Sequence, residues 1–338
     1  MKIAVTGGSG FVGSHVVDKL KGAAISDVKV IDIKNPHRND VEFAKADITK
    51  FEEVKKALAD VDIVYHLAGA ADVNDVFKDP LWATRLNVDG TANILEAARQ
   101  LNIQRILFAS TVWIYSGSPG TMANEESQFY NSGAGHIYNT TKIAGEMMIH
   151  DYNKLYGLPF TILRYGIPYG PRARPTAVIP IFVRKALNNE SLTLQGDGSQ
   201  FRFFMYVEDL AEGNVAALKR IAKNQVYNLD GQKPVTIRQV AETIRNVLGN
   251  VNITYTTARP GDYQGKYVSI DKARRELDWE PRTPFEVGLS KYIEWHKDNN
   301  DMIEAILKSN QPTAQQMNKP SQPAKKIVKR KKRLFGLI

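Results

Sequence analysis

The amino-acid sequence predicts an α/β protein with a doubly wound parallel sheet, followed by a smaller mixed α/β lobe. Short β-rich runs alternate with helical patterns over the first 170 residues. Those runs are almost continuously apolar, as expected for strands whose sheet is covered by helices on both faces. The first run leads straight into a glycine-rich turn and then a helix. Right-handed crossovers between parallel strands convert this alternation into a doubly wound sheet.

The strands and helices of this first half can be placed in order. Five β-rich runs predict the strands Lys2–Thr6, Val28–Asp32, Val61–Leu67, Ile103–Ser110 and Phe160–Tyr165. Asp47 and Ile48 close a further short strand between the second and third of these runs. Helical periodicity fills the intervening stretches, most clearly at Gly13–Lys21, Phe51–Leu58, Trp82–Leu101 and Thr140–Leu155.

After residue 171 the alternation weakens, and Pro171, Pro175 and Pro180 punctuate a loop. Later segments are helical in pattern, except for one strand-like run at Phe201–Val207. The helical segments are Ile181–Leu187, Leu210–Arg220 and Ile237–Leu248. We therefore expect a first domain over residues 1–170 and a smaller lobe over residues 171–308. We also expect the two lobes to exchange a strand and a helix.

Residues 309–338 lack periodicity, are rich in Gln, Asn and Pro, and carry eight basic residues and no acidic one. Such a composition predicts a disordered basic tail. The tail accounts for most of the net charge of +9 and leaves +1 for residues 1–308, so we expect no nucleic-acid partner. Basic residues precede apolar ones within 325–338, which suits peripheral contact with an anionic membrane. A solubilising tail is the alternative.

Composition excludes several other classes of protein. The 338 residues include no cysteine, so disulfide scaffolds, thiolate zinc sites and cysteine nucleophiles are excluded. The six histidines show no ligand spacing, and we expect no metal. No run of 18 apolar residues exists, and the N-terminus lacks the pattern of a signal peptide. We therefore expect a cytoplasmic protein.

A glycine triplet marks the turn after the first strand. Gly7, Gly10 and Gly13 are spaced three apart, and Phe11 and Val12 stand between the last two. Such a turn lets the backbone approach a pyrophosphate closely and places the phosphates at a helix N-terminus. Between a strand and a helix it predicts a dinucleotide-binding Rossmann domain. An ordinary tight turn is the alternative.

Asp32 ends the second predicted strand, 19 residues after Gly13. A carboxylate there accepts hydrogen bonds from both ribose hydroxyls and repels a 2′-phosphate, so NAD is favoured over NADP. A solvated strand end is the alternative interpretation of Asp32.

Two further strand ends fit the same cofactor. Asp47 and Ile48 are placed to meet the adenine. Leu67, Ala68 and Gly69 follow another strand with small residues, where a flat ring can approach the backbone. Either segment could equally be a plain strand terminus.

Tyr138 and Lys142 are spaced four apart at the start of a predicted helix, which puts both on one face. A phenol with a pKa near 10 is a poor base at neutral pH. An adjacent ammonium group and a positive nicotinamide ring favour the phenolate and lower that pKa. Thr111 ends a strand at the carboxyl edge, where open sheets bind ligands. A lone Tyr-x3-Lys pair could also be structural.

These residues together resemble the extended short-chain dehydrogenase/reductase family. The similarity is greatest to its NAD-dependent nucleotide-sugar epimerase/dehydratase group, of the UDP-glucose 4-epimerase type. The resemblance covers about residues 1–297, and runs in both halves of the chain carry it. Its matching runs are Asn87–Thr91, Leu163–Tyr165, Tyr169–Arg172, Gly196–Arg202, Tyr206–Asp209, Arg259–Asp262 and Leu277–Pro281.

The resemblance implies that Thr111, Tyr138 and Lys142 are the catalytic residues. It places Asn87 and Tyr165 near the cofactor. It also implies that Arg202 and Arg259 bind the substrate diphosphate, for which a planar guanidinium is well suited. A homodimer through helices 82–101 and 140–155 is expected on the same basis.

The chain departs from the family pattern at two places. Gly166-Ile167-Pro168 stands where the group usually has an asparagine after Arg-Tyr-Phe, and Phe203 replaces the usual aspartate after Arg202. The sugar or the nucleotide can therefore differ from UDP-glucose.

The neighbours of Thr111 distinguish the reactions open to this group. A dehydratase needs an acid and a carboxylate beside the threonine, and a decarboxylase usually carries a glutamate two positions later. Here Val112 and Trp113 follow, and neither can transfer a proton. Epimerisation at C4 through a keto-sugar needs no extra base, so the sequence favours a UDP-hexose 4-epimerase. The alternatives are another nucleotide-sugar oxidoreductase, dehydratase or decarboxylase, or an NAD-binding scaffold without activity.

Overall fold

The structure, a computed structural model, describes residues 1–309 apart from 24, 26, 130–134 and 258–265. The contacts divide the chain at Asn299. Met1–Asp298 form the main unit, and helix α12 (Asn300–Ser309) belongs to the second. Arg259 and the predicted basic tail lie outside the described residues. Within the described ranges, no helix is both long and apolar enough to cross a bilayer.

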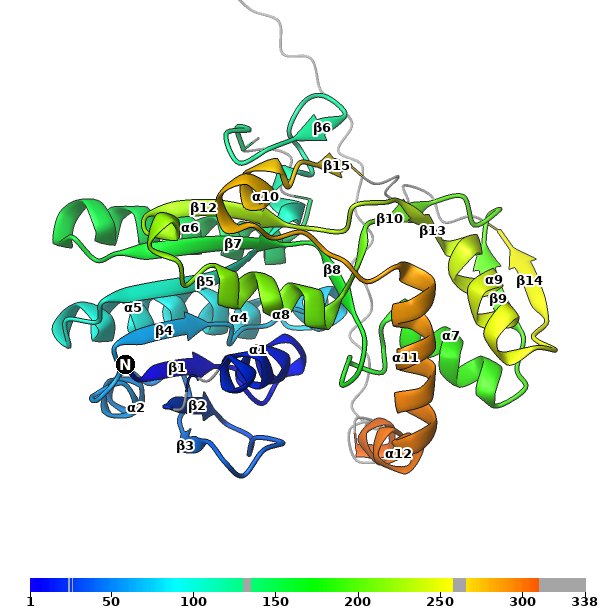
Figure 1. Cartoon of the computed structure of the whole chain (residues 1–338), viewed down its shortest axis with the longest axis horizontal. Coiled ribbons are helices and arrows are strands. Elements are labelled where there is room, and N and C mark those ends of the chain that lie inside the picture. Colours follow the sequence, from blue (N-terminus) through cyan, green and yellow to red (C-terminus); the bar gives the residue numbers. More distant parts are fainter. Residues whose placement is uncertain (24, 26, 130–134, 258–265, 310–338) are drawn as a thin grey trace, which may run out of the picture. The chain divides into compact units, whose positions relative to one another are not determined.

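A seven-stranded parallel sheet lies in one part of the main unit, on the left in Figure 1, and α7 (Val178–Leu187), α9 (Ile237–Leu248) and α11 (Phe285–Asp298) lie to the right of it. Its order is β12-β7-β5-β4-β1-β2-β3, with every neighbouring pair parallel, which confirms the predicted doubly wound sheet. The strands are β1 (Ile3–Thr6), β2 (Val28–Asp32), β3 (Glu42–Lys45), β4 (Ile63–His66), β5 (Arg105–Thr111), β7 (Phe160–Tyr165) and β12 (Gln225–Leu229).

The predicted end of the third strand was wrong. Strand β3 ends at Lys45, so Asp47 and Ile48 follow it rather than close it. The carboxylate of Asp47 accepts hydrogen bonds from the backbone N–H and the hydroxyl of Thr49, at 2.9 and 2.8 Å. This local bonding competes with strand pairing and starts a turn.

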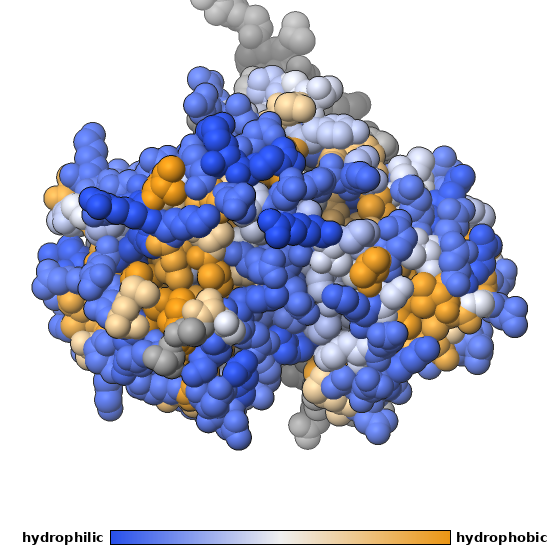
Figure 2. Space-filling model, viewed as in Figure 1, coloured by the Kyte–Doolittle hydropathy of each residue, from blue (hydrophilic) through white to orange (hydrophobic). Residues whose placement is uncertain are grey.

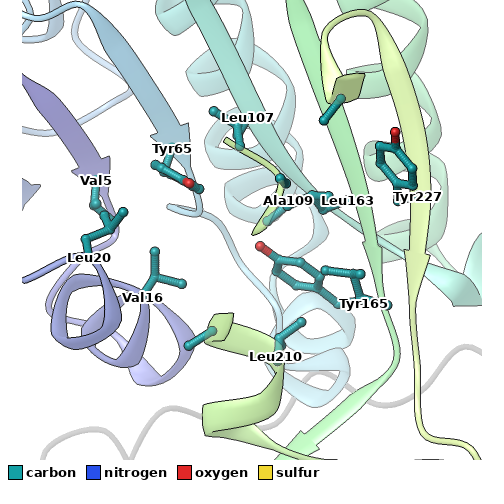
Figure 3. Close-up of a cluster of buried hydrophobic side chains, with 14 of the residues drawn as sticks. Val5, Val16, Leu20, Tyr65, Leu107, Ala109, Leu163, Tyr165, Leu210 and Tyr227 are labelled. Carbon is teal, nitrogen blue, oxygen red and sulfur yellow. The ribbon is translucent and has the colours of Figure 1, made fainter. Parts of the chain in front are cut away.

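Helices cover both faces of this sheet because successive strand residues point to opposite sides. Val5 packs with α1 (Phe11–Gly22) and α8 (Val207–Ala216) in one core cluster (Figure 3). Ala4 belongs to the opposite cluster, beneath α2 (Phe51–Ala57), α5 (Gly90–Gln100) and α6 (Ile137–Tyr156). The cleft described below opens at the carboxyl ends of the strands.

One predicted helix, Trp82–Leu101, is divided. It consists of α4 (Pro80–Thr84), a π-helical turn η1 (Arg85–Asp89) and α5. The carboxylate of Asp79 accepts from the Trp82 N–H at 3.0 Å and caps α4. Helix α3 (Val73–Lys78) precedes it. A π turn inside a helix often marks a functional site, and this one carries Asn87.

The smaller lobe has a third core cluster of its own. On the face of the molecule that Figure 2 shows, most of the surface is hydrophilic. The predicted strand Phe201–Val207 is interrupted at Phe203, because its two halves pair with different strands. Helix α8 begins three residues before the predicted Leu210–Arg220 segment and ends four residues before it. The paired strands are β8 (Ile167–Tyr169) with β11 (Phe204–Tyr206), β9 (Leu192–Gln195) with β14 (Ile253–Thr256), β10 (Phe201–Arg202) with β13 (Val235–Thr236), and β6 (Met122–Ala123) with β15 (Tyr267–Val268).

The remaining helices are distributed along the second half of the chain. The predicted segment Ile237–Leu248 is helix α9, closed at its start by a reciprocal Thr236–Gln239 capping box. The others are α7 (Val178–Leu187), α10 (Asp271–Leu277), α11 (Phe285–Asp298) and the short turns η2 (Val112–Tyr115) and η3 (Arg220–Ala222). The proposed boundary near residue 170 stays a prediction.

Candidate active site

The glycine turn between β1 and α1 requires glycine for steric reasons. Gly7 has a φ of 70°, and a Cβ there would lie 2.7 Å from the backbone nitrogen of Ala68. A Cβ at Gly13 would lie 2.1 Å from the carbonyl oxygen of Gly7. The Gly10 N–H donates to that same carbonyl at 3.0 Å. The turn is therefore tightly folded, and the N-terminus of α1 is left open toward the cleft.

Asp32 stands beside this turn at the end of β2. Its carboxylate accepts from the Ser9 N–H at 3.1 Å and from the Lys34 N–H at 3.0 Å. The two bonds hold the carboxylate next to the turn, where a ribose would lie if the phosphates occupy the helix N-terminus.

A cleft of about 1230 Å³ runs along the carboxyl edge of the sheet. It is large enough for a dinucleotide together with a second ligand. Most of the residues singled out from the sequence line it. They are Gly7, Gly10, Phe11, Val12, Gly13, Asp32, Asp47, Ile48, Leu67, Ala68, Gly69, Thr111, Tyr138, Lys142 and Tyr165. Arg202 lines a separate small cavity, and Asn87 lines neither.

Asn87 instead bonds two segments that border the cleft, the one after β4 and helix α6. Its side-chain oxygen accepts from the Ala70 N–H at 2.7 Å, and its amide donates to the Ala70 carbonyl at 3.0 Å. The same amide donates to the Thr141 hydroxyl on α6 at 2.9 Å. The π turn thereby fastens the segment after β4 to the helix that carries Tyr138 and Lys142.

A second buried chain of hydrogen bonds runs through His66. The Ala68 N–H donates to the Thr6 hydroxyl at 3.3 Å, and that hydroxyl lies 2.9 Å from Nδ1 of His66. Nε2 lies 3.0 Å from the Thr91 hydroxyl, which donates to the Asn87 carbonyl at 2.6 Å. Burial, with the nearby Lys142 charge, lowers the pKa of His66 to about 3. A neutral ring that donates from Nε2 and accepts at Nδ1 completes the chain.

Tyr138 and Thr111 face each other across the cleft end of β5 and α6. Burial raises the pKa of Tyr138 to about 12, although a hydrogen bond with Thr111 and the charge of Arg174 act in the opposite direction. The sequence predicted that Lys142 and a bound nicotinamide ring together lower this pKa. The causes found in the structure are different, and the chain's own groups do not offset the burial.

Lys142 is 6% exposed and turned toward β5. Its ammonium group donates to the Ala109 carbonyl at 2.9 Å and lies 4.9 Å from the centre of the Phe108 ring. Burial lowers the pKa of Lys142 to about 8. The side chain is therefore close to the point at which it gives up its charge.

The buried Lys142 predicts a pH-dependent stability in the nucleotide-free protein. Its pKa is lower in the folded chain than in the unfolded chain, so the unfolded chain binds more protons between about pH 8 and pH 10.5. The free energy of unfolding should therefore rise with pH through that window, by up to about 3 kcal/mol. Denaturant unfolding should be measured at several pH values for the wild type and for Lys142→Met. The difference between their free energies of unfolding isolates the effect of Lys142, because all other groups titrate in both proteins. A difference between the two proteins that does not change with pH would refute it.

Two residues of the cleft were missed from the sequence. His136 precedes α6, and its ring stacks on that of Tyr138 with centroids 5.9 Å apart. Arg174 also lines the cleft, and its guanidinium lies 3.5 Å from the carboxylate of Asp72. The Arg-Ala-Arg-Pro run around Arg174 was the available signal, but only the fold brings it opposite Tyr138. Among the described residues, no cluster of three or more His, Asp or Glu could hold a metal ion.

Comparisons with known proteins agree with this geometry. The sequence model of a protein family, described as the NAD dependent epimerase/dehydratase family, matches residues 3–230. A Methanocaldococcus jannaschii protein, provisionally named a UDP-glucose 4-epimerase, is 35% identical over 307 residues, covering 88% of this chain and 99% of that protein.

Solved structures resemble the chain over a similar length. The UDP-glucose 4-epimerase of Thermotoga maritima with UDP-glucose has a TM-score of 0.81 at 28% identity, covering 89% of this chain and 100% of that one. The dTDP-glucose 4,6-dehydratase of Streptomyces venezuelae with NAD has a TM-score of 0.82 at 26% identity, covering 90% of this chain and 100% of that one. The similar proteins thus catalyse more than one reaction.

Proposed function

This chain belongs to the NAD-dependent epimerase/dehydratase family, and from that premise we propose that it is a nucleotide-sugar 4-epimerase acting on a UDP-hexose. The observation that carries the proposal is the set of residues where the end of β5 meets the start of α6 in the cleft. Thr111 and Tyr138 are present, whereas Val112 and Trp113 occupy the positions beside Thr111. Epimerisation requires the first pair and no additional proton donor.

The residues of the cleft fit NAD, the cofactor of this family. The glycine turn, too tight for a Cβ at Gly7 or Gly13, lines the cleft at the N-terminus of α1, and Asp32 stands beside it. When bound, NAD supplies a hydride acceptor and donor for the sugar carbon and a positive ring that favours the Tyr138 phenolate. Lys142 and Tyr165 line the inner part of the same cleft.

The chain's own groups then perform the proton chemistry. The oxygen of Tyr138 takes the proton of the C4 hydroxyl. It returns the proton after the keto-sugar has rotated in the cleft to present its opposite face. Thr111 hydrogen-bonds Tyr138 and is placed to orient the same hydroxyl. Because the same phenol removes the proton from the sugar and returns it, Tyr138 ends the cycle in the protonation state in which it began.

The proposal is tested by offering the purified protein a panel of UDP-, GDP- and dTDP-sugars and separating the products by chromatography. We expect interconversion of one pair of C4 epimers without release of a keto-sugar. A released 4-keto-6-deoxy product would identify a dehydratase. Absence of any product, together with no reduced-nicotinamide absorbance on adding each sugar, would favour a binding scaffold.

The carboxylate of Asp32 predicts cofactor choice. Asp32→Ala should weaken NAD binding by about 10- to 100-fold, since charged hydrogen bonds to the ribose are lost, and should reduce discrimination against NADP. Titration of both nucleotides by calorimetry measures this. Asp27→Ala, at the exposed opposite end of β2, is the control and should leave both affinities unchanged. Equal losses in the two variants would exclude a ribose contact by Asp32.

We also propose a homodimer built on α5 and α6. Support comes from the exposed apolar side chains Met147, Leu155 and Tyr156 on α6.

A further inference from the structure

A second, small cavity adjoins the main cleft. Its volume of about 30 Å³ has room for about two water molecules. Trp113 and Ile167 line both this cavity and the main cleft, so the two spaces adjoin. Arg202, Asp230 and Lys266 contribute its polar groups.

Strand register places Asp230 close to the reacting groups. Thr111 pairs with Tyr165 across β5 and β7, and Tyr165 pairs with Leu229 across β7 and β12. Asp230 is the next residue after Leu229. Neighbouring strands lie about 4.8 Å apart, so Leu229 and Thr111 are separated by two strand spacings, or about 10 Å. Asp230 therefore stands about that far from Thr111, at the same edge of the sheet. Carboxyl ends of adjacent strands are the ordinary position for ligand contacts in such sheets.

The carboxyl group of Asp230 is buried but sparsely bonded. The side chain is 3% exposed, and its one hydrogen bond within the described residues comes from the Gly231 N–H at 2.8 Å. Neither Arg202 nor Lys266 forms an ion pair with it. A carboxyl group can make several more bonds than this, and buried polar groups without partners are costly. Burial raises the pKa of Asp230 to about 8, so the group is mainly a neutral acid at neutral pH.

Gly166 makes room for this carboxyl group. A Cβ at Gly166 would lie 1.8 Å from Oδ1 of Asp230, so glycine is required there as long as the aspartate is present. The same stretch, Gly166-Ile167-Pro168, is where the chain departs from the pattern of the group that it resembles. Phe203, the other departure, also lines the small cavity. Both departures therefore meet around Asp230.

We propose that Asp230 determines sugar specificity, by hydrogen-bonding a hydroxyl or hydroxymethyl substituent that enters the small cavity. This inference rests on the proposed function, because it assumes a nucleotide-sugar in the main cleft. A neutral carboxyl group both donates and accepts, which matches a hydroxyl group. Room for about two water-sized groups suits the two heavy atoms of a hydroxymethyl group better than the four of an acetamido group.

The test uses NAD-loaded protein and calorimetric titration with UDP and with UDP-glucose, UDP-galactose and UDP-N-acetylglucosamine. Asp230→Ala should weaken UDP-hexose binding by about 5- to 10-fold and leave UDP affinity within about twofold, because UDP lacks the hexose. Asp230→Asn keeps a donor and an acceptor, and should retain wild-type affinity within about threefold. The enlarged cavity of Asp230→Ala should also raise the relative affinity for the acetamido sugar.

Asp209→Asn is the matched control. Asp209 is also a buried aspartate, but its carboxylate is bonded to the N–H and hydroxyl of Thr283 at 2.9 and 3.0 Å, away from the cavity. It should lower the melting temperature and leave the ratio of UDP-hexose to UDP affinity unchanged. The proposal is overturned if Asp230→Ala leaves the ratio of UDP-hexose to UDP affinity unchanged. It is also overturned if Asp209→Asn changes that ratio, or Asp230→Asn weakens UDP-hexose binding, as much as Asp230→Ala does.

The outcomes also separate this inference from the proposed function. If the wild type interconverts a UDP-hexose pair while Asp230→Ala keeps the wild-type ratio, only the role of Asp230 is wrong. If the wild type binds no nucleotide-sugar, the proposed function fails and the role of Asp230 fails with it.

Discussion

Replacing Tyr138 by phenylalanine should lower kcat for epimerisation by about 10³-fold while NAD stays bound. The phenol is the group in the cleft that is placed to exchange a proton with the C4 hydroxyl, and its hydrogen bond with Thr111 is lost in the variant. Removal of a general acid–base group costs this order of rate. The ring itself is retained, so stacking on His136 and the shape of the cleft are preserved. Product analysis by chromatography and the nucleotide content of the purified variant measure the two effects.

Tyr152→Phe is the control for this substitution, since Tyr152 lies on the same helix and bonds Glu96 at 3.2 Å outside the cleft. It should keep wild-type turnover. If Tyr138→Phe retained more than about a tenth of the wild-type rate, the phenol could not be the proton acceptor.

Gly13→Ala should abolish measurable NAD binding, which we place at a loss of at least about 100-fold. The new Cβ would meet the carbonyl oxygen of Gly7 at 2.1 Å, a backbone atom that cannot move without opening the turn. An opened turn separates the helix N-terminus from the position of the phosphates. The melting temperature should fall as well, because Gly7 also packs directly against the backbone of Leu67 and Ala68.

Gly22→Ala separates the steric effect from the general effect of alanine in a helix. Gly22 lies at the other end of α1, and a Cβ there would meet nothing within 4 Å. Alanine is the better helix former, so this variant should be as stable as the wild type or slightly more stable. Full nucleotide affinity in Gly13→Ala, measured by the same titration, would show that the turn does not hold the cofactor.

Much of the fold was predictable because its signals are local. Continuous apolar runs predicted β1, β2, β4, β5 and β7, each within two residues of its observed bounds. Strand β12 was not predicted, since Gln225 and Asn228 interrupt its apolar pattern and its partner β7 is distant in sequence. The interruption at Phe203 also depends on which strands pair, which no local pattern reveals.

The candidate site was predictable where spacing or a turn defines it. The glycine turn, Asp32 and the pair Tyr138 and Lys142 all line one cleft. The electrostatic argument was less successful, because helical spacing places Lys142 on the right face but does not show that its ammonium group bonds the Ala109 carbonyl. Asp230 is brought beside the site by strand order alone.

The position of β12 has a consequence for synthesis on the ribosome. Strand β7 ends at Tyr165, whereas its outer neighbour β12 begins at Gln225. At about 5–20 residues per second, the nascent chain carries β7 for several seconds before its partner exists. During that interval the open edge can pair with other chains. Slow translation of residues 166–224 should therefore increase aggregation of the newly made protein, and a chain released before residue 225 should depend on chaperones to stay in solution.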